Sequence, residues 1–397
     1  MSPIPRLRDY RGPAMLSYGF RPFFLFGAIY AALTILAWLP LFAGELTLST
    51  AFGPIDWHVH EMLYGYLPAI VTGFLLTAIP NWTGRLPIQG TPLLVLALVW
   101  LAGRVAVTYS VRIGWLPAAM IDVSFLVLVI AAAAREIAAG KNWRNLRVIV
   151  LVVLLLAGNV AFHIEAHVAG SAEYGARIGI AAILLLIVLI GGRIVPSFTR
   201  NWLARENPGR LPAPFGKFDG AVILFSALSL GLWIALPAGT VTGVALIAAG
   251  LLHIVRLARW AGDRTLRDRL VLILHVGYAF VPLGFLLVGA SALGSVMGDA
   301  GTHAWMVGAA GIMTLAVMTR ASLGHTGRAL IASPVTQGIY AAAIVAAVAR
   351  ICASLQPDWA INFLRLSVGA WVAAFFGFAV LFGPLLLSTR RDDGRKN

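Results

Sequence analysis

Apolar runs recur along almost the whole chain, and a run of about 20 residues is long enough to cross the hydrocarbon core of a bilayer. Of the 397 residues, 60% are hydrophobic and only 12% are charged, whereas soluble domains are about 25% charged. The connections between the runs are short and contain Arg, Pro and Gly, which leaves no room for a sizeable soluble domain. The sequence therefore predicts an all-α polytopic bundle, with residues 1–397 forming a single transmembrane domain.

Counting the apolar runs together with the residues that interrupt them predicts twelve transmembrane helices. Because this number is even, both chain termini are expected on the same side of the membrane. The predicted spans are 20–43, 57–80, 91–110, 115–134, 146–168, 174–196, 218–236, 239–258, 269–291, 303–320, 333–354 and 360–388.

The chain is basic, with a formal net charge of +14. We interpret this charge as an orientation signal, because the cytoplasmic loops of membrane proteins collect Lys and Arg. The connections 135–147, 197–217 and 256–269 and the C-terminal tail are rich in Arg or in Arg and Lys, whereas GELTLSTAFGPID and SALGSVMGDAGT contain neither. Both termini are therefore predicted to be cytoplasmic.

A single cysteine, Cys352, excludes an internal disulfide framework and a thiolate metal cluster, because both need several sulfur atoms. Any metal site must use nitrogen and oxygen ligands. The sequence also lacks a Gly-rich phosphate loop and a Cys-X-X-Cys-His haem attachment motif.

The eight histidines are distributed unevenly across the predicted membrane. His253 and His275 lie in the inner-leaflet halves of the eighth and ninth spans, and His325 lies in a predicted cytoplasmic loop. The other five are predicted at the outer face: His58, His60, His163, His167 and His303.

The segment WHVHE at the start of the second span contains His58, His60 and Glu61. Residues two apart in a helix project about 200° apart, so the two imidazoles either belong to a loop or have different partners. Glu61 is predicted to be an oxygen ligand or an acceptor that fixes an imidazole tautomer. The alternative is a group of interfacial polar residues, with Trp57 in the aromatic belt.

His163 and His167 are four residues apart, so they share one helical face and have the spacing that lets two imidazoles chelate one ion. Glu165 lies off that face and is predicted to pair with Arg177. The alternative is a pair of solvated histidines at a helix end.

Three further histidines are candidate cofactor ligands. His303 begins the tenth span, and with His58 or His60 it would suit a bis-histidine haem. His253 and His275 lie on adjacent spans, where an ionisable residue suggests a functional site. Either they hold a second metal or haem, or they are hydrogen-bonded to each other or to a carbonyl group.

Several arginines lie in the outer third of their spans, against the positive-inside trend. Guanidinium groups bind carboxylates in a bidentate manner, so these residues are candidates for binding haem propionates. Asp122, near the outer end of the fourth span, is an alternative partner for one of them, and contact with lipid headgroups is another alternative. The candidates for propionate binding are Arg104, Arg112 and Arg177.

A weak internal repeat is visible at the inner ends of three spans. AIPNWTGR, IVPSFTRNW and AVMTRASLGHTGR end the second, sixth and tenth spans. An interval of four spans is consistent with three pseudo-symmetric four-helix units.

Four long segments together resemble the NnrS family: WHVHEMLYGYLPAIVTGFLLTAIPNWTGR, GNVAFHIEAHVAG, GGRIVPSFTRNWL and HAWMVGAAGIMTLAVMTRASLGHTGR. The resemblance covers most of the chain. It implies a bacterial inner-membrane protein with twelve spans that binds haem, expected to be of the b type, and copper. It also implies a role in nitric oxide and nitrosative stress or denitrification. The expected partners are membrane lipids, nitric oxide and an electron donor, without nucleic acid.

The layout is more distantly similar to the haem-copper oxidase catalytic subunit, which also has twelve spans in a threefold arrangement. This chain lacks the adjacent His-His pair, the His-X-His on the tenth span and the His-Pro-Glu segment of that subunit. The departures speak against an oxygen-reducing binuclear centre.

Three functions remain open at this point. The first is a haem- and copper-binding protein, and possible oxidoreductase, that binds or converts nitric oxide or iron-nitrosyl species at the periplasmic side. The second is a transporter without a redox cofactor, whose site would be formed by broken helices. The third is a haem-binding nitric oxide sensor without turnover.

Overall fold

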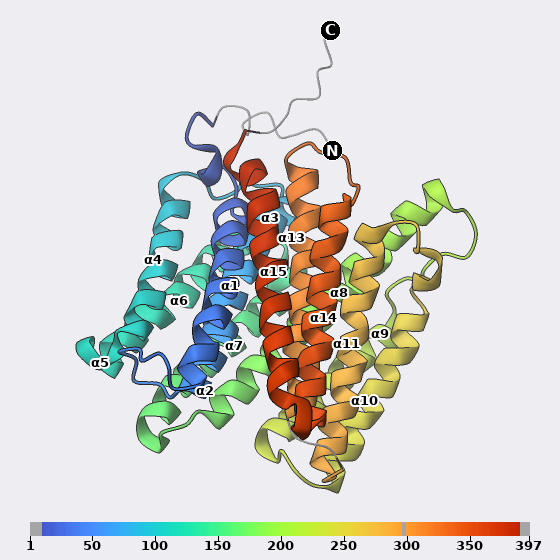
Figure 1. Cartoon of the computed structure of the whole chain (residues 1–397). Helices are drawn as coiled ribbons and strands as arrows, with labels where there is room; N and C mark the ends of the chain where they lie inside the picture. The colour runs from blue at the N-terminus through green and yellow to red at the C-terminus, as the bar shows by residue number, and fades with distance from the viewer. Residues whose placement is uncertain (1–9, 296–298, 390–397) are drawn as a thin grey trace. The chain divides into compact units, whose positions relative to one another are not determined.

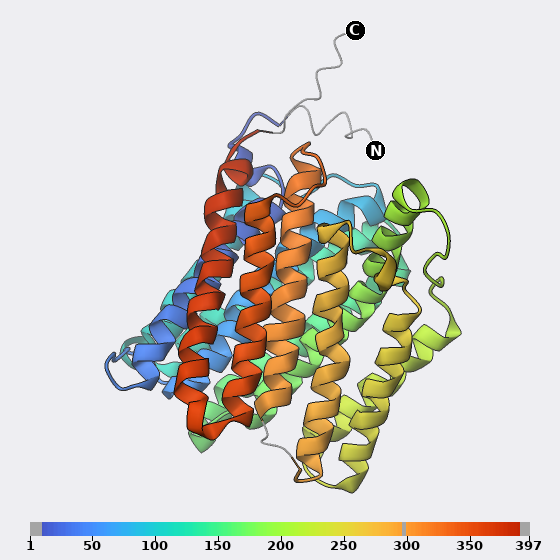
Figure 2. The ribbon, with the colours of Figure 1, turned by 45° about the vertical axis from the view of Figure 1, so that its right-hand side comes forward.

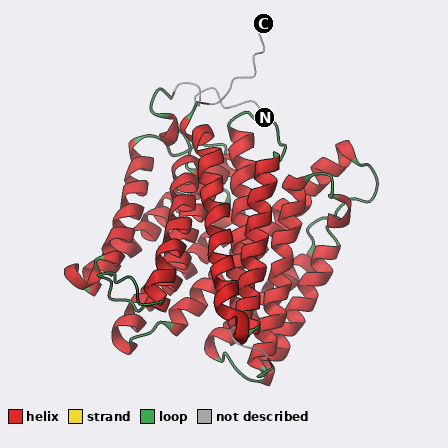
Figure 3. Ribbon diagram, in the orientation of Figure 1, coloured by secondary structure: helices red, strands yellow, loops and turns green. Residues whose placement is uncertain are grey.

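A computed structural model describes residues 10–295 and 299–389, and within these ranges all regular secondary structure is helical (Figures 1 and 3). The α-helices are α1 (Phe20–Phe42), α2 (Pro54–His60), α3 (Leu67–Thr83), α4 (Thr91–Thr108), α5 (Ser110–Ile113), α6 (Trp115–Ala139), α7 (Leu146–Ala169), α8 (Glu173–Glu206), α9 (Lys217–Ala235), α10 (Thr240–Ala258), α11 (Arg269–Ala292), α12 (Asp299–His303), α13 (Ile312–His325), α14 (Pro334–Leu355) and α15 (Ala360–Leu387).

Twelve helical segments in the described chain are long and apolar enough to cross a membrane, one for each predicted span. The prediction of a polytopic helical bundle is therefore confirmed. Several spans are longer than predicted, and the largest differences are in the sixth, which continues to Glu206, and in the tenth, which covers Asp299–His325. His325 thus ends α13 instead of lying in a loop, and its ring packs near Phe20 with centroids 5.4 Å apart.

The second and tenth spans each contain a π-helical segment. In the second span, Glu61–Tyr66 is π-helical and joins α2 to α3. In the tenth, Ala304–Gly311 joins α12 to α13. A π turn has one more residue than an α turn, and such turns are frequent at functional sites. The first of them begins directly after His60.

The contacts divide the chain into two compact units, and the predicted three-unit arrangement is not confirmed. The first unit contains α1 to α7, the beginning of α8, residues 321–329 and the second half of α15. The second contains the rest of α8, α9 to α12, most of α13, α14 and the first half of α15.

In the first unit, α4 packs on α6, α6 packs on α7, and α1 packs on α3. An apolar core cluster joins α1, α3, α4 and α6, and it includes Phe23, Trp100 and Phe125. Trp100 also donates a hydrogen bond from Nε1 to the carbonyl oxygen of Gly65 (2.9 Å), which fixes α4 against the π-helical segment. These contacts bring polar residues of the first five spans together.

In the second unit, α10 and α11 lie side by side, as both views show (Figures 1 and 2). They carry His253 and Tyr278, which are both completely buried.

Candidate functional site

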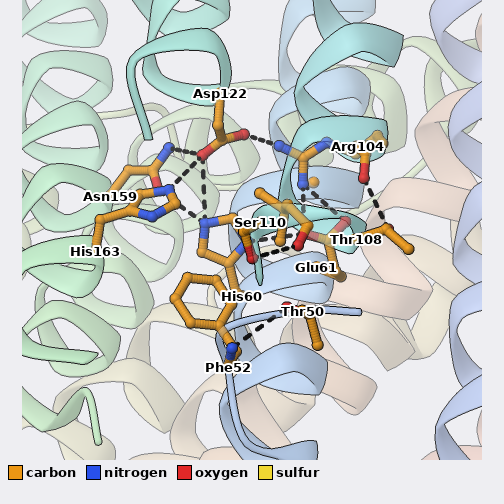
Figure 4. Close-up of polar contacts among 12 residues, drawn as sticks. Thr50, Phe52, His60, Glu61, Arg104, Thr108, Ser110, Asp122, Asn159 and His163 are labelled. Atoms are coloured by element: carbon orange, nitrogen blue, oxygen red, sulfur yellow. Dashed lines mark hydrogen bonds and ion pairs between the residues drawn. The ribbon is translucent and has the colours of Figure 1, made fainter. Parts of the chain in front are cut away.

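A buried polar cluster lies in the first unit, where α2, the π-helical segment, α4, α6 and α7 converge (Figure 4). Its members come from the first five spans, and all but the partly buried tyrosine are at most 5% exposed. We call it the His60 cluster. It consists of Tyr30, His60, Glu61, Arg104, Asp122, Asn159 and His163.

Arg104 lies between two carboxylates. Its Nη1 donates to both oxygens of Glu61 (2.9 Å each), and its Nη2 donates to Oδ1 of Asp122. The hydroxyl of Tyr30 also donates to Glu61. Asp122 therefore pairs with an arginine, which was the alternative to propionate binding by Arg104. Breaking such a buried pair is strongly destabilising, because a charge is left uncompensated.

His60 lies at the centre of the cluster and faces oxygen atoms on both sides. Its Nδ1 is 2.8 Å from Oε1 of Glu61, while its Nε2 is 3.1 Å from Oδ1 of Asn159 and 3.3 Å from Oδ2 of Asp122. Glu61 thus lies where it can fix the imidazole tautomer, one of its two predicted roles.

A neutral imidazole carries one N–H and cannot satisfy acceptors at both nitrogens. If Nδ1 donates to Glu61, the Nε2 lone pair faces two oxygens. If Nε2 carries the proton, the lone pair of Nδ1 faces Glu61 instead. Rotating the Asn159 amide only moves the mismatch, because its oxygen would then face the carboxylate of Asp122. The arrangement needs one more proton, on His60 or on a facing carboxylate, or a cation beside His60.

Counting the charges leads to the same conclusion. Two carboxylates, Glu61 and Asp122, share one guanidinium, that of Arg104, so the cluster has one uncompensated negative charge when its histidines are neutral. Buried charges require a partner. A proton on an imidazole or on a carboxylate, or a bound cation, can supply the missing charge.

His163 completes a group of three possible ligands. Its Nε2 is 3.0 Å from Oδ2 of Asp122, and Asn159 donates to the same oxygen (2.8 Å). One ligand atom from each of His60, Asp122 and His163 lies within 4.8 Å of the others, and all three residues are buried. Two imidazole nitrogens and a carboxylate oxygen are a donor set that suits copper, iron or zinc.

A cavity of about 180 Å³ borders this group, with Ser110, Trp115, His163 and His167 in its wall. Phe52 also lines it, and the Phe52 ring packs on His60 and His163 with centroid distances of 5.0 and 5.3 Å. The loop before α2 holds this ring in place, because the backbone N–H of Ala51 donates to Oγ of Ser110 (2.8 Å).

The other histidines predicted near this site have different surroundings. His58 stacks on Trp38 with ring centroids 4.5 Å apart, so the two histidines of WHVHE have different partners, as their spacing indicated. His167 is exposed and stacks on Trp115 at 4.1 Å. It shares a cavity wall with His163 but does not belong to the buried group.

The remaining outer arginines of the first unit are more exposed than Arg104. Arg112 is exposed, and its guanidinium lies 6.0 Å from the ring centre of Tyr109. Arg177 pairs with Glu173 (3.5 Å). The expected pair between Glu165 and Arg177 is not formed, because Glu165 accepts the N–H groups of Tyr174 and Gly175 at the start of α8 (3.1 and 2.6 Å).

In the second unit, His253 belongs to an ordered chain of hydrogen bonds. Arg256 donates to the hydroxyl of Tyr278 (2.8 Å), which lies 3.0 Å from Nδ1 of His253. Nε2 of His253 is 2.9 Å from Oγ of Ser226, whose own proton goes to a backbone carbonyl. Arg256 also pairs with Asp219 (2.9 Å). We call these five residues the Arg256 cluster.

His275 and His303 have further separate partners. Nε2 of His275 is 2.8 Å from the hydroxyl of Thr199. Nδ1 of His303 lies 2.7 Å from the carbonyl oxygen of Asp299, whose side chain pairs with Arg350 (3.1 Å). The predicted haem sites at these residues stay predictions.

Sequence reasoning missed two members of the His60 cluster, Tyr30 and Asn159. Both are uncharged and lie within apolar runs, so neither attracts notice as an ionisable residue does. A usable signal exists for Asn159: it precedes His163 by four residues in α7 and therefore shares its helical face.

Comparison with known proteins agrees with the resemblance seen in the sequence. No curated protein sequence matches the chain. The model of the family described as NnrS protein matches residues 14–390, which include all twelve spans and the whole His60 cluster. This membrane protein with a buried His-Asp-His group belongs to the NnrS family.

Proposed function

We propose that the His60 cluster binds one transition-metal ion and that nitric oxide binds at this ion. Membership of the NnrS family fits a membrane protein of the nitric oxide response. The observation that supports the metal most directly is the convergence of His60, Asp122 and His163 in a buried group that lacks one positive charge.

The residues around the group fit a metal ion. Nε2 of His60 and Nε2 of His163 offer nitrogen ligands, and Asp122 offers an oxygen ligand. Glu61 accepts from the other nitrogen of His60, an arrangement that orients metal-binding imidazoles and makes them more basic. Arg104 binds Oδ1 of Asp122, which leaves Oδ2 of the same carboxylate directed at the histidines.

A copper or iron ion at this position would supply an open coordination site for a small ligand. The protein's own residues would shape that site. Phe52 packs on both imidazoles and limits access by water, and Asn159 orients Asp122. Copper is the ion expected from the family resemblance.

Haem is less well supported in the first unit. The cavity that borders His163 and His167 has a volume of about 180 Å³, whereas pockets for small organic ligands are typically ~300–1,000 Å³. The residues around this cavity therefore do not fit a porphyrin. Haem of the b type, the electron donor, the periplasmic position of the site and the location in the inner membrane remain expectations from the sequence.

Metal analysis of the detergent-purified protein tests the proposal. We expect about one copper or iron ion per chain, and a tenfold or greater loss of metal in His163→Gln, because a ligand is removed. His167→Gln is the matched control: it changes an exposed histidine four residues along the same helix, and we expect it to retain the metal.

Nitric oxide is then added to the metal-loaded protein. A change in the optical or electron paramagnetic resonance spectrum of the ion, absent in His163→Gln, would support the site, and consumption of nitric oxide with an electron donor would distinguish an enzyme from a sensor. A folded, metal-free wild-type protein would overturn the proposal. Transport would then be tested by uptake into vesicles.

A further inference from the structure

A second and larger cavity lies in the first unit, away from the histidines. Its volume is about 1200 Å³, and α4, α6 and the connection at 84–90 form its walls. The two helices differ in length: α4 has 18 residues and α6 has 25. At 1.5 Å per residue, α6 is about 10 Å longer than α4. The last turns of α6 therefore extend past the beginning of α4, and the nonhelical connection at 84–90 lines the cavity beside them.

The walls that α4 and α6 contribute are largely apolar up to Ala132 of α6. Val95 of α4 and Leu128 of α6 line it and are 46% and 39% exposed, and Ala131 and Ala132 lie one turn further along α6. Such a surface suits a hydrocarbon chain better than a soluble metabolite, because the spans that carry it face the lipid bilayer.

The mouth of the cavity is basic. Arg85 and Arg135 both pair with Glu136, at 2.5 and 3.3 Å, and their side chains are 43% and 79% exposed. Two guanidinium groups share one carboxylate, so the rim has an excess of one positive charge. Both arginines keep donors free for a further anion, since each guanidinium has five.

The loop that follows α6 adds further positive charge close to this mouth. Its fold is fixed by Asn142, whose Nδ2 donates to the carbonyl oxygen of Trp82 (2.6 Å) near the end of α3. Trp143 in the same loop is 60% exposed, as is typical of tryptophan at a membrane interface. The exposed basic residues of this loop are Lys141 and Arg144, and Arg147 follows at the start of α7.

We propose that this cavity binds an anionic phospholipid. One acyl chain would lie against Val95 and Leu128, and the phosphate would lie between Arg85 and Arg135. Basic pockets between transmembrane helices at the membrane interface are known to bind anionic headgroups. The net positive rim favours an anionic over a zwitterionic headgroup, and the apolar walls favour a lipid over a soluble phosphate. The proposal does not depend on the metal site.

Native mass spectrometry of the full-length purified protein tests this inference with phosphatidylglycerol and with phosphatidylcholine of the same acyl chains. We expect the wild-type protein to retain one phosphatidylglycerol in preference to phosphatidylcholine. Arg135→Ala removes an exposed guanidinium and is expected to weaken that retention about fivefold. Val95→Trp fills the cavity and is expected to abolish the preference.

Two matched variants separate this site from general effects. Leu94→Trp places the same bulk on the neighbouring exposed position of α4, which does not line the cavity. Arg112→Ala removes an exposed arginine beyond the other end of α4. Both should keep the preference for phosphatidylglycerol.

Three outcomes would overturn the inference. The first is equal retention of the two lipids by the wild-type protein, and the second is an unchanged preference in a folded Val95→Trp variant. The third is displacement of the bound lipid by glycerol phosphate at equal concentration, which would show that the acyl chain adds nothing.

Discussion

The two units bury similar polar clusters that differ in charge balance. In the Arg256 cluster, one arginine meets one carboxylate, that of Asp219. In the His60 cluster, one arginine meets two, those of Glu61 and Asp122. Each cluster also contains a buried histidine and a tyrosine, so the composition is similar while the net charge is not.

The hydrogen bonds differ in the same way. Donors run in one direction through the Arg256 cluster, from Arg256 to Tyr278, His253 and Ser226, and both nitrogens of His253 have a suitable partner. His60 instead faces acceptors on both sides. A buried ionisable group inside a membrane protein therefore suggests a cation site only when its charges and donors fail to balance locally.

Removing the arginine is the strongest test of this comparison. Arg104→Met and Arg256→Met should each destabilise the protein by about 3–5 kcal/mol, because buried carboxylates are left without a partner. Thermal unfolding of the purified variants in detergent, together with the yield of folded protein, measures the effect.

Second substitutions then separate the two clusters. Asp219→Asn should restore most of the stability lost in Arg256→Met, since it removes the single unpaired charge. Asp122→Asn should restore only part of the stability lost in Arg104→Met, because Glu61 remains charged and unpaired. Equal rescue in the two clusters would contradict the excess negative charge that we assign to the His60 cluster.

Two glycines that pack against the arginines allow a second comparison of the clusters, with a smaller expected loss of stability. A Cβ at Gly65 would lie 2.6 Å from Nη1 of Arg104, and one at Gly192 would lie 2.8 Å from Cζ of Arg256. Gly65→Ala and Gly192→Ala should therefore each cost about 1–3 kcal/mol through overpacking, as measured by thermal unfolding.

Only Gly65→Ala should also lower metal affinity, because Arg104 orients Asp122. Metal content after equilibration with a competing chelator measures this difference. A comparable loss of metal in Gly192→Ala would mean that the ion is not confined to the His60 cluster.

Phe52→Ala should have the smallest effect on stability, about 1 kcal/mol, because the ring is only partly buried. Its main effect should be kinetic. Without the ring, a chelator reaches the ion directly from the cavity beside His163, so metal release should become faster while the amount bound at equilibrium stays similar. Leu46→Ala changes a residue of the same loop that lies outside the cavity wall, so it should release metal at the wild-type rate. Equal release rates in the Phe52→Ala and Leu46→Ala variants would rule out a blocking role for Phe52.

All twelve spans could be predicted because length and apolarity are local properties of the sequence. The π-helical segments could not, since their hydropathy is the same as that of an α-helix and tertiary contacts such as that of Trp100 with Gly65 support the geometry. Hydropathy also failed to predict the end of the sixth span, because a basic and Pro-containing segment continues as helix to Glu206.

Part of the site was visible in the sequence because ionisable residues within apolar runs are rare. His60, Glu61, Arg104 and His163 were found in this way. Which histidine of each pair turns inward was not predictable, because aromatic partners outside the motif decide it. Trp38 packs on His58 and Trp115 packs on His167, while the other histidine of each pair meets Asp122.

Synthesis of the chain delivers the buried charges to the membrane in the order Glu61, Arg104, Asp122. Inserted alone near the centre of a helix, Asp or Arg costs about 2.5–3.5 kcal/mol. The third and fourth spans would therefore enter the bilayer more readily if the second span stayed close by, because Arg104 could then pair with Glu61 before Asp122 arrives. The charge network of the mature protein therefore favours release of its first spans from the insertion machinery as a group. Site-specific crosslinking of truncated nascent chains can measure how long the second span stays beside that machinery.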